Sequence, residues 1–278
     1  MSRQAVRETV LVTGAGGMMG RMMRPRLRRP GRTLRLLDVA EQHPPGPSEQ
    51  VEVVTGSVTD PELLREACAG VDAVIHLGGL SRRSSWAEIL NVNVDGARCL
   101  LEAARHAGVP RVVLASSHHA AGFFTRDDAG PEGLPADAGP RPDTPYGWSK
   151  AAVEALGRYY HDRAGMDVIC LRIGSCFERP PGPATRSLPM WLSPADGARL
   201  LEACLAAPAP AFRIVWGISR NTRRWLSLAE GEAIGYHPED DSEAYAAELI
   251  AEHGEPDLSD PLHRQLGGPF CLFPMEDS

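Results

Sequence analysis

A tyrosine and a lysine four residues apart are the side chains whose spacing most directly suggests chemistry in this 278-residue chain. Lysine and arginine together number 29, and Lys150 is the single lysine among them. It follows Tyr146 by four residues in a stretch that reads as a helix, so both side chains project from one face. A nearby ammonium favours the phenolate, which can take the proton of an alcohol. We expect Tyr146 to be a general base assisted by Lys150; the alternative is a surface lysine retained by drift.

Alternating short apolar runs and amphipathic stretches must position this pair, and they are typical of βαβ units with a parallel sheet. The strands expected are residues 9–13, 34–38, 51–55, 73–77, 111–116 and 167–173. The helices expected are residues 18–27, 61–68, 91–106 and 150–163. Two loops rich in proline and glycine, 122–145 and 178–189, read as irregular lids or binding loops. A helix at 194–206, a strand at 212–216 and an irregular acidic tail complete the chain.

A glycine-rich turn joins the first expected strand to the first expected helix. Gly14, Gly17 and Gly20 recur every third residue there, a spacing that lets main-chain N–H groups approach a pyrophosphate at a helix N-terminus. Asp38 ends the second strand 18 residues beyond Gly20, where a carboxylate can bond ribose hydroxyls and repel a 2′-phosphate. This pattern predicts NAD as the cofactor. The alternatives are a plain βα turn and a turn-forming aspartate.

These patterns predict an α/β fold, a Rossmann-type doubly wound parallel sheet with a small C-terminal substrate-binding extension. We divide the chain into an NAD-binding Rossmann domain, residues 1–175, and an extension, residues 176–278, packed on it as one compact unit.

The composition limits the partners of the chain. A net charge of −7 and a pI near 5.7 argue against a nucleic-acid or anionic-membrane surface. The absence of a signal peptide and of an apolar run long enough to span a membrane predicts a cytoplasmic protein. The six cysteines form no C-x-x-C pair, which indicates reduced thiols and no metal site.

Several further motifs complete a resemblance. They are His76-Leu-Gly-Gly79 after the fourth strand, Asn93-Val-Asp-Gly96, and Ser116-Ser117 at the end of the fifth strand. With the glycine turn and the Tyr146–Lys150 pair, they make the chain resemble the extended short-chain dehydrogenases/reductases, the NAD-dependent epimerase/dehydratase superfamily. Within that superfamily, segments 76–81, 115–119, 172–176 and 215–219 are similar to the bacterial uronate dehydrogenases.

This resemblance implies NAD-dependent oxidation of the C1 hydroxyl of galacturonate or glucuronate to the aldarolactone. It implies a small-molecule uronic acid as partner and a homo-oligomeric enzyme. Ser117, near the carboxyl end of its strand, joins Tyr146 and Lys150 as the residue that holds the reacting oxygen. The cofactor contacts implied are Gly14, Gly17, Met18, Met19, Gly20, Asp38, Ser57, Val58, Leu77, Gly78, Gly79, Lys150 and Cys176.

The substrate contacts that the resemblance implies are Ser81, Ser117, His118, His119, Ser175 and Arg186. Planar, bidentate recognition of a carboxylate favours arginine, and Arg186 matches the carboxylate-binding position of the family. Arg172 is its rival, but it belongs to a motif that the family pattern treats as core.

The chain departs from the family pattern in three places, and the role of Asn93 stays open. His118 stands where the family usually has asparagine, and a histidine can titrate near neutral pH. Ser57 replaces the aspartate that many relatives use to bind adenine, which leaves Asp60 as a substitute. Segment 221–225 also departs from the pattern. Asn93 lies in the middle of a helix, where it either supports the proton relay known in this superfamily or belongs to a solvated face.

Two other functions stay open for this scaffold. One is a nucleotide-sugar epimerase or dehydratase, for which the chain is short after residue 173. The other is a non-catalytic NAD(P)-sensing regulator, which has no need of Tyr146, Lys150 and Ser117 together.

Overall fold

A seven-stranded parallel sheet forms the centre of the protein. The computed structural model describes residues 7–81, 84–182 and 185–275. The strands run in the order β3-β2-β1-β4-β5-β6-β9, and every neighbouring pair is parallel. They are β1 Glu8–Thr13, β2 Arg32–Asp38, β3 Val51–Thr55, β4 Ala73–His76, β5 Arg111–Ser117, β6 Asp167–Ile173 and β9 Phe212–Gly217. The chain therefore builds outward from β1 in one direction and from β4 in the other, which confirms the doubly wound α/β fold.

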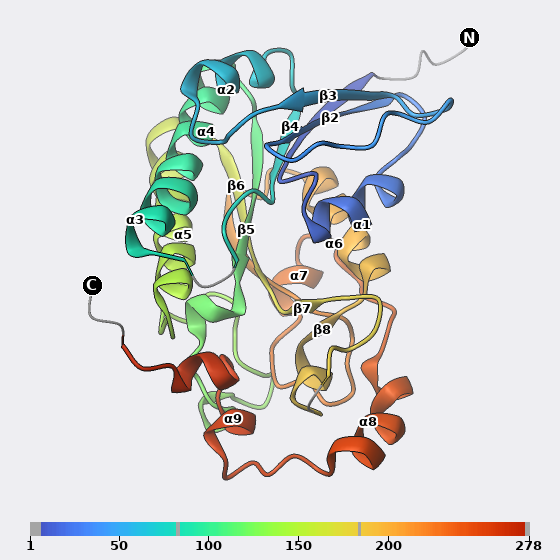
Figure 1. Cartoon of the computed structure of the whole chain (residues 1–278), viewed down its shortest axis with the longest axis vertical. Coiled ribbons are helices and arrows are strands. Elements are labelled where there is room, and N and C mark those ends of the chain that lie inside the picture. The colour runs from blue at the N-terminus through green and yellow to red at the C-terminus, as the bar shows by residue number, and fades with distance from the viewer. Residues whose placement is uncertain (1–6, 82–83, 183–184, 276–278) are drawn as a thin grey trace.

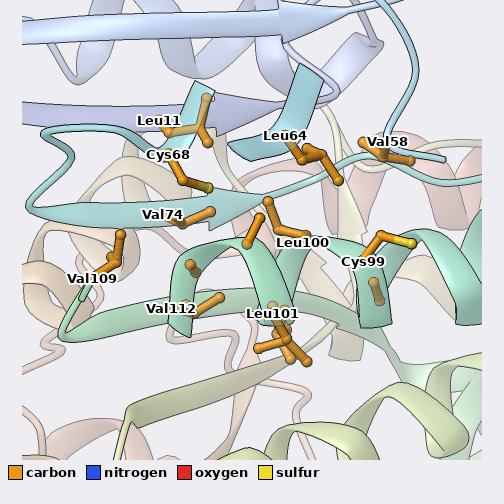
Figure 2. Packing of buried hydrophobic residues seen from close by; sticks show 14 of the residues in the cluster. Leu11, Val58, Leu64, Cys68, Val74, Cys99, Leu100, Leu101, Val109 and Val112 are labelled. Atoms are coloured by element: carbon orange, nitrogen blue, oxygen red, sulfur yellow. The ribbon is translucent and has the colours of Figure 1, made fainter. Parts of the chain in front are cut away.

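Helices cover both faces of this sheet (Figure 1). One layer contains α2 Pro61–Cys68, α4 Gly96–His106 and α5 Pro145–Ala164, and the other contains α1 Met18–Arg26 and α6 Pro194–Ala206. Alternation along β1 supplies both cores, because Leu11 packs under the first layer while Val10 and Val12 pack under the second. Figure 2 shows the first core, in which side chains from α2 and α4 meet those of the strands.

Three of the main helices begin at polar caps followed by proline. Asp60, Thr144 and Ser193 each accept hydrogen bonds from main-chain N–H groups of the first turn of α2, α5 and α6, and proline occupies the next position in all three. A polar cap satisfies one of the free N–H groups, and proline there loses no hydrogen bond. The Thr144 cap fixes where α5 starts, and hence how Tyr146 and Lys150 are presented.

Several segments differ from the sequence-based expectation. The helix expected at 91–106 starts earlier, with α3 Trp86–Glu88 and a π-helical stretch η1 Ile89–Asp95 before α4. The loops expected to be irregular contain 3₁₀ turns, η3 Arg126–Asp128 and η4 Thr185–Met190. The tail is also more regular than expected. It contains α7 Ala229–Glu232, η5 Ser242–Tyr245, α8 Ala246–His253, α9 Pro261–Arg264 and η6 Gly268–Leu272.

Part of the second half of the chain belongs to the central sheet. Strand β9 pairs with β6, and α6 lies against α1, so the sheet continues past the domain boundary placed after residue 175. A small second sheet pairs β7 Ser175–Cys176 with β8 Trp191–Leu192. In Figure 1 this sheet and the tail helices α8 and α9 lie at the end of the molecule where strands β5 and β6 finish. The two-part division itself stays a prediction.

Candidate active site

The carboxyl ends of the central strands bring most of the expected site residues to one edge of the sheet. Thr13 at the end of β1 pairs in register with Leu37 of β2 and with His76 of β4. Ser117 at the end of β5 pairs with Ile173 of β6. Ligands of open α/β sheets bind at this edge, next to the point where the strand order reverses.

The glycine-rich turn is built so tightly that two of its positions exclude a side chain. Gly14 has a φ of +68°, and a Cβ there would lie 2.5 Å from the main-chain nitrogen of Gly78. A Cβ on Gly20 would lie 2.5 Å from the carbonyl oxygen of Ala15. Gly17 then occupies the N-cap of α1, without a side chain to satisfy the first N–H groups, and Met18 and Met19 open the helix. This arrangement fits a pyrophosphate.

Asp38 stabilises this turn in addition to its expected role. Its carboxylate accepts hydrogen bonds from the main-chain nitrogens of Gly16 at 2.8 Å and Ala40 at 2.8 Å. Each carboxylate oxygen can accept a second hydrogen bond, so ribose hydroxyls can still be bound. The contact to Gly16 was missed in the sequence because only the three regularly spaced glycines carry the motif.

A buried hydrogen bond between Thr13 and His76 shapes the segment that follows β4. The threonine hydroxyl lies 2.7 Å from Nδ1 of His76 and also accepts a bond from the Gly78 nitrogen at 3.3 Å. Burial, with a smaller contribution from the charge of Lys150, lowers the pKa of His76 to about 3. The imidazole is therefore neutral, and it acts by holding residues 77–79, the expected cofactor contacts, against the glycine turn.

The residues expected at the adenine end and beside the nicotinamide are either hydrogen-bonded within the protein or buried. The Ser57 hydroxyl lies 2.8 Å from that of Thr59. Asp60 caps α2 through bonds of 3.0 and 3.2 Å, so it is already engaged. Val58 is buried. Cys176 is buried in β7, and burial raises its thiol pKa to about 12. Its thiol is therefore unreactive, and Cys176 can contact a cofactor only through its main-chain atoms and van der Waals packing.

Tyr146, Lys150 and Ser117 lie together, although not as the sequence suggested. The Lys150 ammonium donates to the carbonyl oxygen of Ala115 at 2.7 Å and lies 5.7 Å from the centre of the Tyr146 ring. Burial lowers the pKa of Lys150 to about 8. Burial also raises the pKa of Tyr146, while its hydrogen bond with Ser117 acts in the opposite direction. Burial therefore dominates the pKa of Tyr146, which is raised and not lowered as the Lys150 spacing predicted.

Asn93 is buried within the π-helical stretch. Its side chain accepts from the Leu80 nitrogen at 2.7 Å and donates to the Leu80 oxygen at 3.0 Å and to the Ser149 hydroxyl at 3.0 Å. A solvated polar face is therefore wrong. The residue fixes the segment leading to Ser81, which is itself exposed and precedes residues 82–83, outside the described part of the chain.

The two adjacent histidines are both buried but have different partners. Nδ1 of His118 lies 3.1 Å from the carbonyl oxygen of Ile173. The buried Nε2 of His118 has no hydrogen-bond partner among the described residues. Burial, followed by the charges of His119 and Arg186, lowers the pKa of His118 well below its ordinary value. The expectation that His118 titrates near neutral pH is wrong, because burial disfavours the charged form of its imidazole.

Arg186 lies in η4 and is covered by the tail. Its guanidinium donates to the carbonyl oxygen of Leu266 at 2.5 Å, and burial lowers its pKa. A cavity of about 330 Å³ lies beside it, lined also by Arg126, Arg223 and His263. Arg126, like Arg186, has its pKa lowered by burial, and its buried Nε lacks a partner among the described residues. Ser175, the last of the expected substrate contacts, is half-buried at the start of β7.

Arg172, the rival carboxylate ligand, is buried in an ion pair. It is 1% exposed and makes a bidentate ion pair with Glu154, at 2.9 and 2.8 Å. The Ser116 hydroxyl donates to the same carboxylate at 2.6 Å. Both charges of this pair are already satisfied.

Two residues near the site were missed from the sequence. Asp143, in the loop before α5, accepts a bond from His119, and Phe270, in the tail, stacks on the same ring with centroids 4.1 Å apart. The only sequence signal was the Gly267-Gly268 pair, which permits the tail to approach closely.

Among the described residues, no cluster of three or more His, Cys, Asp or Glu side chains could hold a metal ion. No described helix is long and apolar enough to cross a membrane.

Comparison with known proteins agrees with this geometry. The sequence matches the NAD dependent epimerase/dehydratase family over residues 10–225. It is 38% identical over 264 residues to a uronate dehydrogenase of Pseudomonas putida, covering 95% of each chain. It is 37% identical over 263 residues to an NAD-dependent glucose-6-phosphate dehydrogenase of Haloferax volcanii, covering 90% of this chain and 98% of that one. A crystal structure of a uronate dehydrogenase mutant from Agrobacterium tumefaciens complexed with NAD superposes with a TM-score of 0.89, at 36% identity, covering 98% of this chain and 100% of that one.

Proposed function

Since this chain belongs to the NAD-dependent epimerase/dehydratase family, we propose that it oxidises the C1 hydroxyl of a hexuronate, galacturonate or glucuronate, to the aldarolactone with NAD. The observation that carries the proposal is the grouping of Tyr146, Ser117 and Lys150 at the carboxyl end of the sheet, where the buried Lys150 ammonium bonds the carbonyl oxygen of Ala115 at 2.7 Å and lies 5.7 Å from the centre of the Tyr146 ring. The similarity to uronate dehydrogenases over nearly the whole chain supports the sugar acid as substrate.

The glycine turn and the residues around it fit NAD. The close approach of Gly14 to Gly78 leaves a smooth main-chain surface, and the N-terminus of α1 provides N–H groups for the pyrophosphate. In this proposal Asp38 binds the adenosine ribose, and its charge disfavours a 2′-phosphate. NAD, when bound, supplies the acceptor for the hydride that leaves C1 of the sugar.

The chain's own residues handle the proton and the orientation of the substrate. Ser117 holds the reacting oxygen, and Tyr146 accepts the hydroxyl proton as C1 becomes the lactone carbonyl. Lys150, whose pKa is about 8, lies below the tyrosine ring and is available to the nicotinamide ribose. At the other end of the sugar, the donors of Arg186 not used by Leu266 bind the carboxylate, with Ser81, His118, His119 and Ser175 around the ring.

A kinetic screen tests the proposal. Galacturonate, glucuronate, glucose 6-phosphate and the neutral aldoses are each incubated with NAD or NADP, and the absorbance of the reduced cofactor is followed. We expect net NADH formation with at least one uronate and none with the Tyr146→Phe variant. An epimerase would regenerate its cofactor and give no net NADH, and silence with both uronates would refute the proposal.

Glucose 6-phosphate belongs in this screen for a structural reason. The cavity beside Arg186 contains a second arginine, Arg126, without a carboxylate partner among the described residues, and a phosphate carries more charge than a carboxylate. The relative from Haloferax volcanii bears that activity in its name. Uronate remains the first candidate because a solved uronate dehydrogenase and a solved glucuronic acid dehydrogenase match 98% and 96% of this chain. A homo-oligomeric state and a cytoplasmic location remain predictions.

A further inference from the structure

A buried aspartate holds one ring nitrogen of His119. Nδ1 of His119 lies 2.6 Å from Oδ2 of Asp143, whose side chain is 0% exposed. A carboxylate only accepts hydrogen bonds, so Nδ1 is the donor. The main-chain nitrogen of Asp143 also donates to the His119 carbonyl oxygen at 3.4 Å, and the Thr144 hydroxyl donates to Oδ1 at 2.9 Å. The two residues are therefore joined through both side chain and main chain.

Three glycines from distant parts of the chain make room for this carboxylate. A Cβ placed on Gly122, Gly147 or Gly267 would lie 2.1, 2.9 or 2.0 Å from a carboxylate oxygen of Asp143. Real Cβ atoms do not approach oxygen so closely, so any side chain there would displace the carboxylate or the main chain. The loop after β5, the first turn of α5 and the tail thus all close around one side chain that the expected mechanism does not use.

The His119 ring is fixed from both sides. Its centre lies 4.0 Å from that of His118, 4.1 Å from that of Phe270 and 5.8 Å from that of Tyr146. A tenth of the side-chain surface stays exposed. Nε2 makes no hydrogen bond to any residue in the described part of the chain. This nitrogen is the one polar atom of the ring left for a ligand.

We propose that Asp143 is a positioning residue that holds His119 in the Nδ1–H tautomer, so that Nε2 accepts a hydrogen bond from a hydroxyl group of the sugar. This inference rests on the proposed oxidation of a hexuronate. A neutral imidazole with its proton on Nδ1 has its lone pair on Nε2, and the aspartate removes the alternative arrangement. A sugar hydroxyl then donates to Nε2 while Nδ1 keeps its bond to Asp143.

Imidazole nitrogen chemical shifts of the ¹⁵N-labelled protein test the tautomer without any use of activity. In the wild-type protein we expect the His119 signals of a ring protonated at Nδ1. In Asp143→Asn, the amide can donate to Nδ1, and we expect a shift toward the Nε2–H form. A wild-type ring protonated at Nε2 would overturn the proposal whether or not the variant folds, and whether or not the enzyme oxidises uronates.

A double-mutant cycle tests the effect on substrate. The kcat/KM for the uronate that the wild-type protein turns over is measured in Asp143→Asn, His119→Gln and the double variant. We expect Asp143→Asn to lower kcat/KM by about 10- to 100-fold, with NAD affinity unchanged, and to change it less than about threefold when His119 is already replaced.

The cycle separates positioning from a merely structural role. An equal loss in both backgrounds, or wild-type kcat/KM in Asp143→Asn, would overturn the proposal. The negative charge of Asp143 raises the pKa of Tyr146, so removing that charge alone should favour the phenolate. A loss of activity therefore cannot come from this electrostatic effect. If no uronate is oxidised by the wild-type protein, the proposed function fails, and the tautomer measurement still decides the role of Asp143.

Discussion

The ammonium of Lys150 is bonded to the carbonyl oxygen of Ala115 at 2.7 Å, two residues before Ser117 on the same strand. This bond ties α5 to β5 where the tyrosine and serine hydroxyls meet. The contact is short and buried, and a compact ammonium on a flexible stem can make it while still facing a ligand. Burial lowers the pKa of Lys150 to about 8, so the group can also exchange its proton near physiological pH.

Replacing this lysine with arginine should impair the enzyme. The guanidinium of Lys150→Arg is larger and planar at this buried position and cannot give up a proton, so we expect kcat/KM for the uronate to fall by about 100-fold. We also expect weaker NAD binding, and steady-state kinetics together with an NAD titration measure the two losses. Arg158→Lys, at an exposed ion pair on the same helix, is the matched control and should stay near wild type. Near-normal kinetics in Lys150→Arg would remove the lysine from the mechanism.

Acid should destabilise the protein through His76, the buried histidine that is hydrogen-bonded to Thr13. The folded-state pKa of His76 is about 3, below its ordinary value of 6.5, so the unfolded chain binds a proton first as the pH falls. The free energy of unfolding is therefore lost below pH 6.5, by about 2 kcal/mol between pH 7 and pH 5 for each histidine of this kind. Urea denaturation at the two pH values measures this loss.

The matched control for this pH effect is a variant that has no titratable group at position 76. His76→Asn keeps a hydrogen-bonding group near Thr13 but cannot titrate, so the loss between pH 7 and pH 5 should shrink by about 2 kcal/mol. His118 contributes in the same direction and remains in that variant. The same pH dependence in wild type and His76→Asn would show that His76 is not the group responsible.

The sequence predicted those parts of the fold and site that depend on local patterns. Alternating apolar runs gave the parallel sheet, and the glycine spacing gave the turn at Gly14. The role of Asp143 could not be predicted from the sequence, because its carboxylate is enclosed by Gly122, Gly147 and Gly267, which come from distant segments of the chain. The raised pKa of Tyr146 was missed for a similar reason, since burial depends on the whole fold and the spacing shows only that Lys150 is near.

Breaking the buried pair of Arg172 and Glu154 should cost much of the stability. Arg172→Met leaves the Glu154 carboxylate buried, with Ser116 as its one remaining hydrogen-bond donor among the described residues, so we expect the free energy of unfolding to fall by about 3–5 kcal/mol. Denaturant titration measures the loss. The exposed pair of Arg158 and Asp162 gives the control, and Arg158→Met should cost less than about 1 kcal/mol. Equal effects at both positions would contradict the assignment of Arg172 to the core.

Binding of the substrate carboxylate should depend on Arg186. Arg186→Ala removes a charge-assisted hydrogen bond worth about 1.5–3 kcal/mol, so we expect kcat/KM for the uronate to fall by about 10- to 100-fold with NAD affinity unchanged. Because Arg186 also donates to Leu266, thermal unfolding must be measured alongside kinetics. Arg223→Ala is the control, since Arg223 lines the same cavity but is already paired with Glu243 at 2.8 Å. Unchanged uronate kinetics in Arg186→Ala would transfer the role to another cation, and Arg126, unpaired across that cavity, would be the next residue to replace.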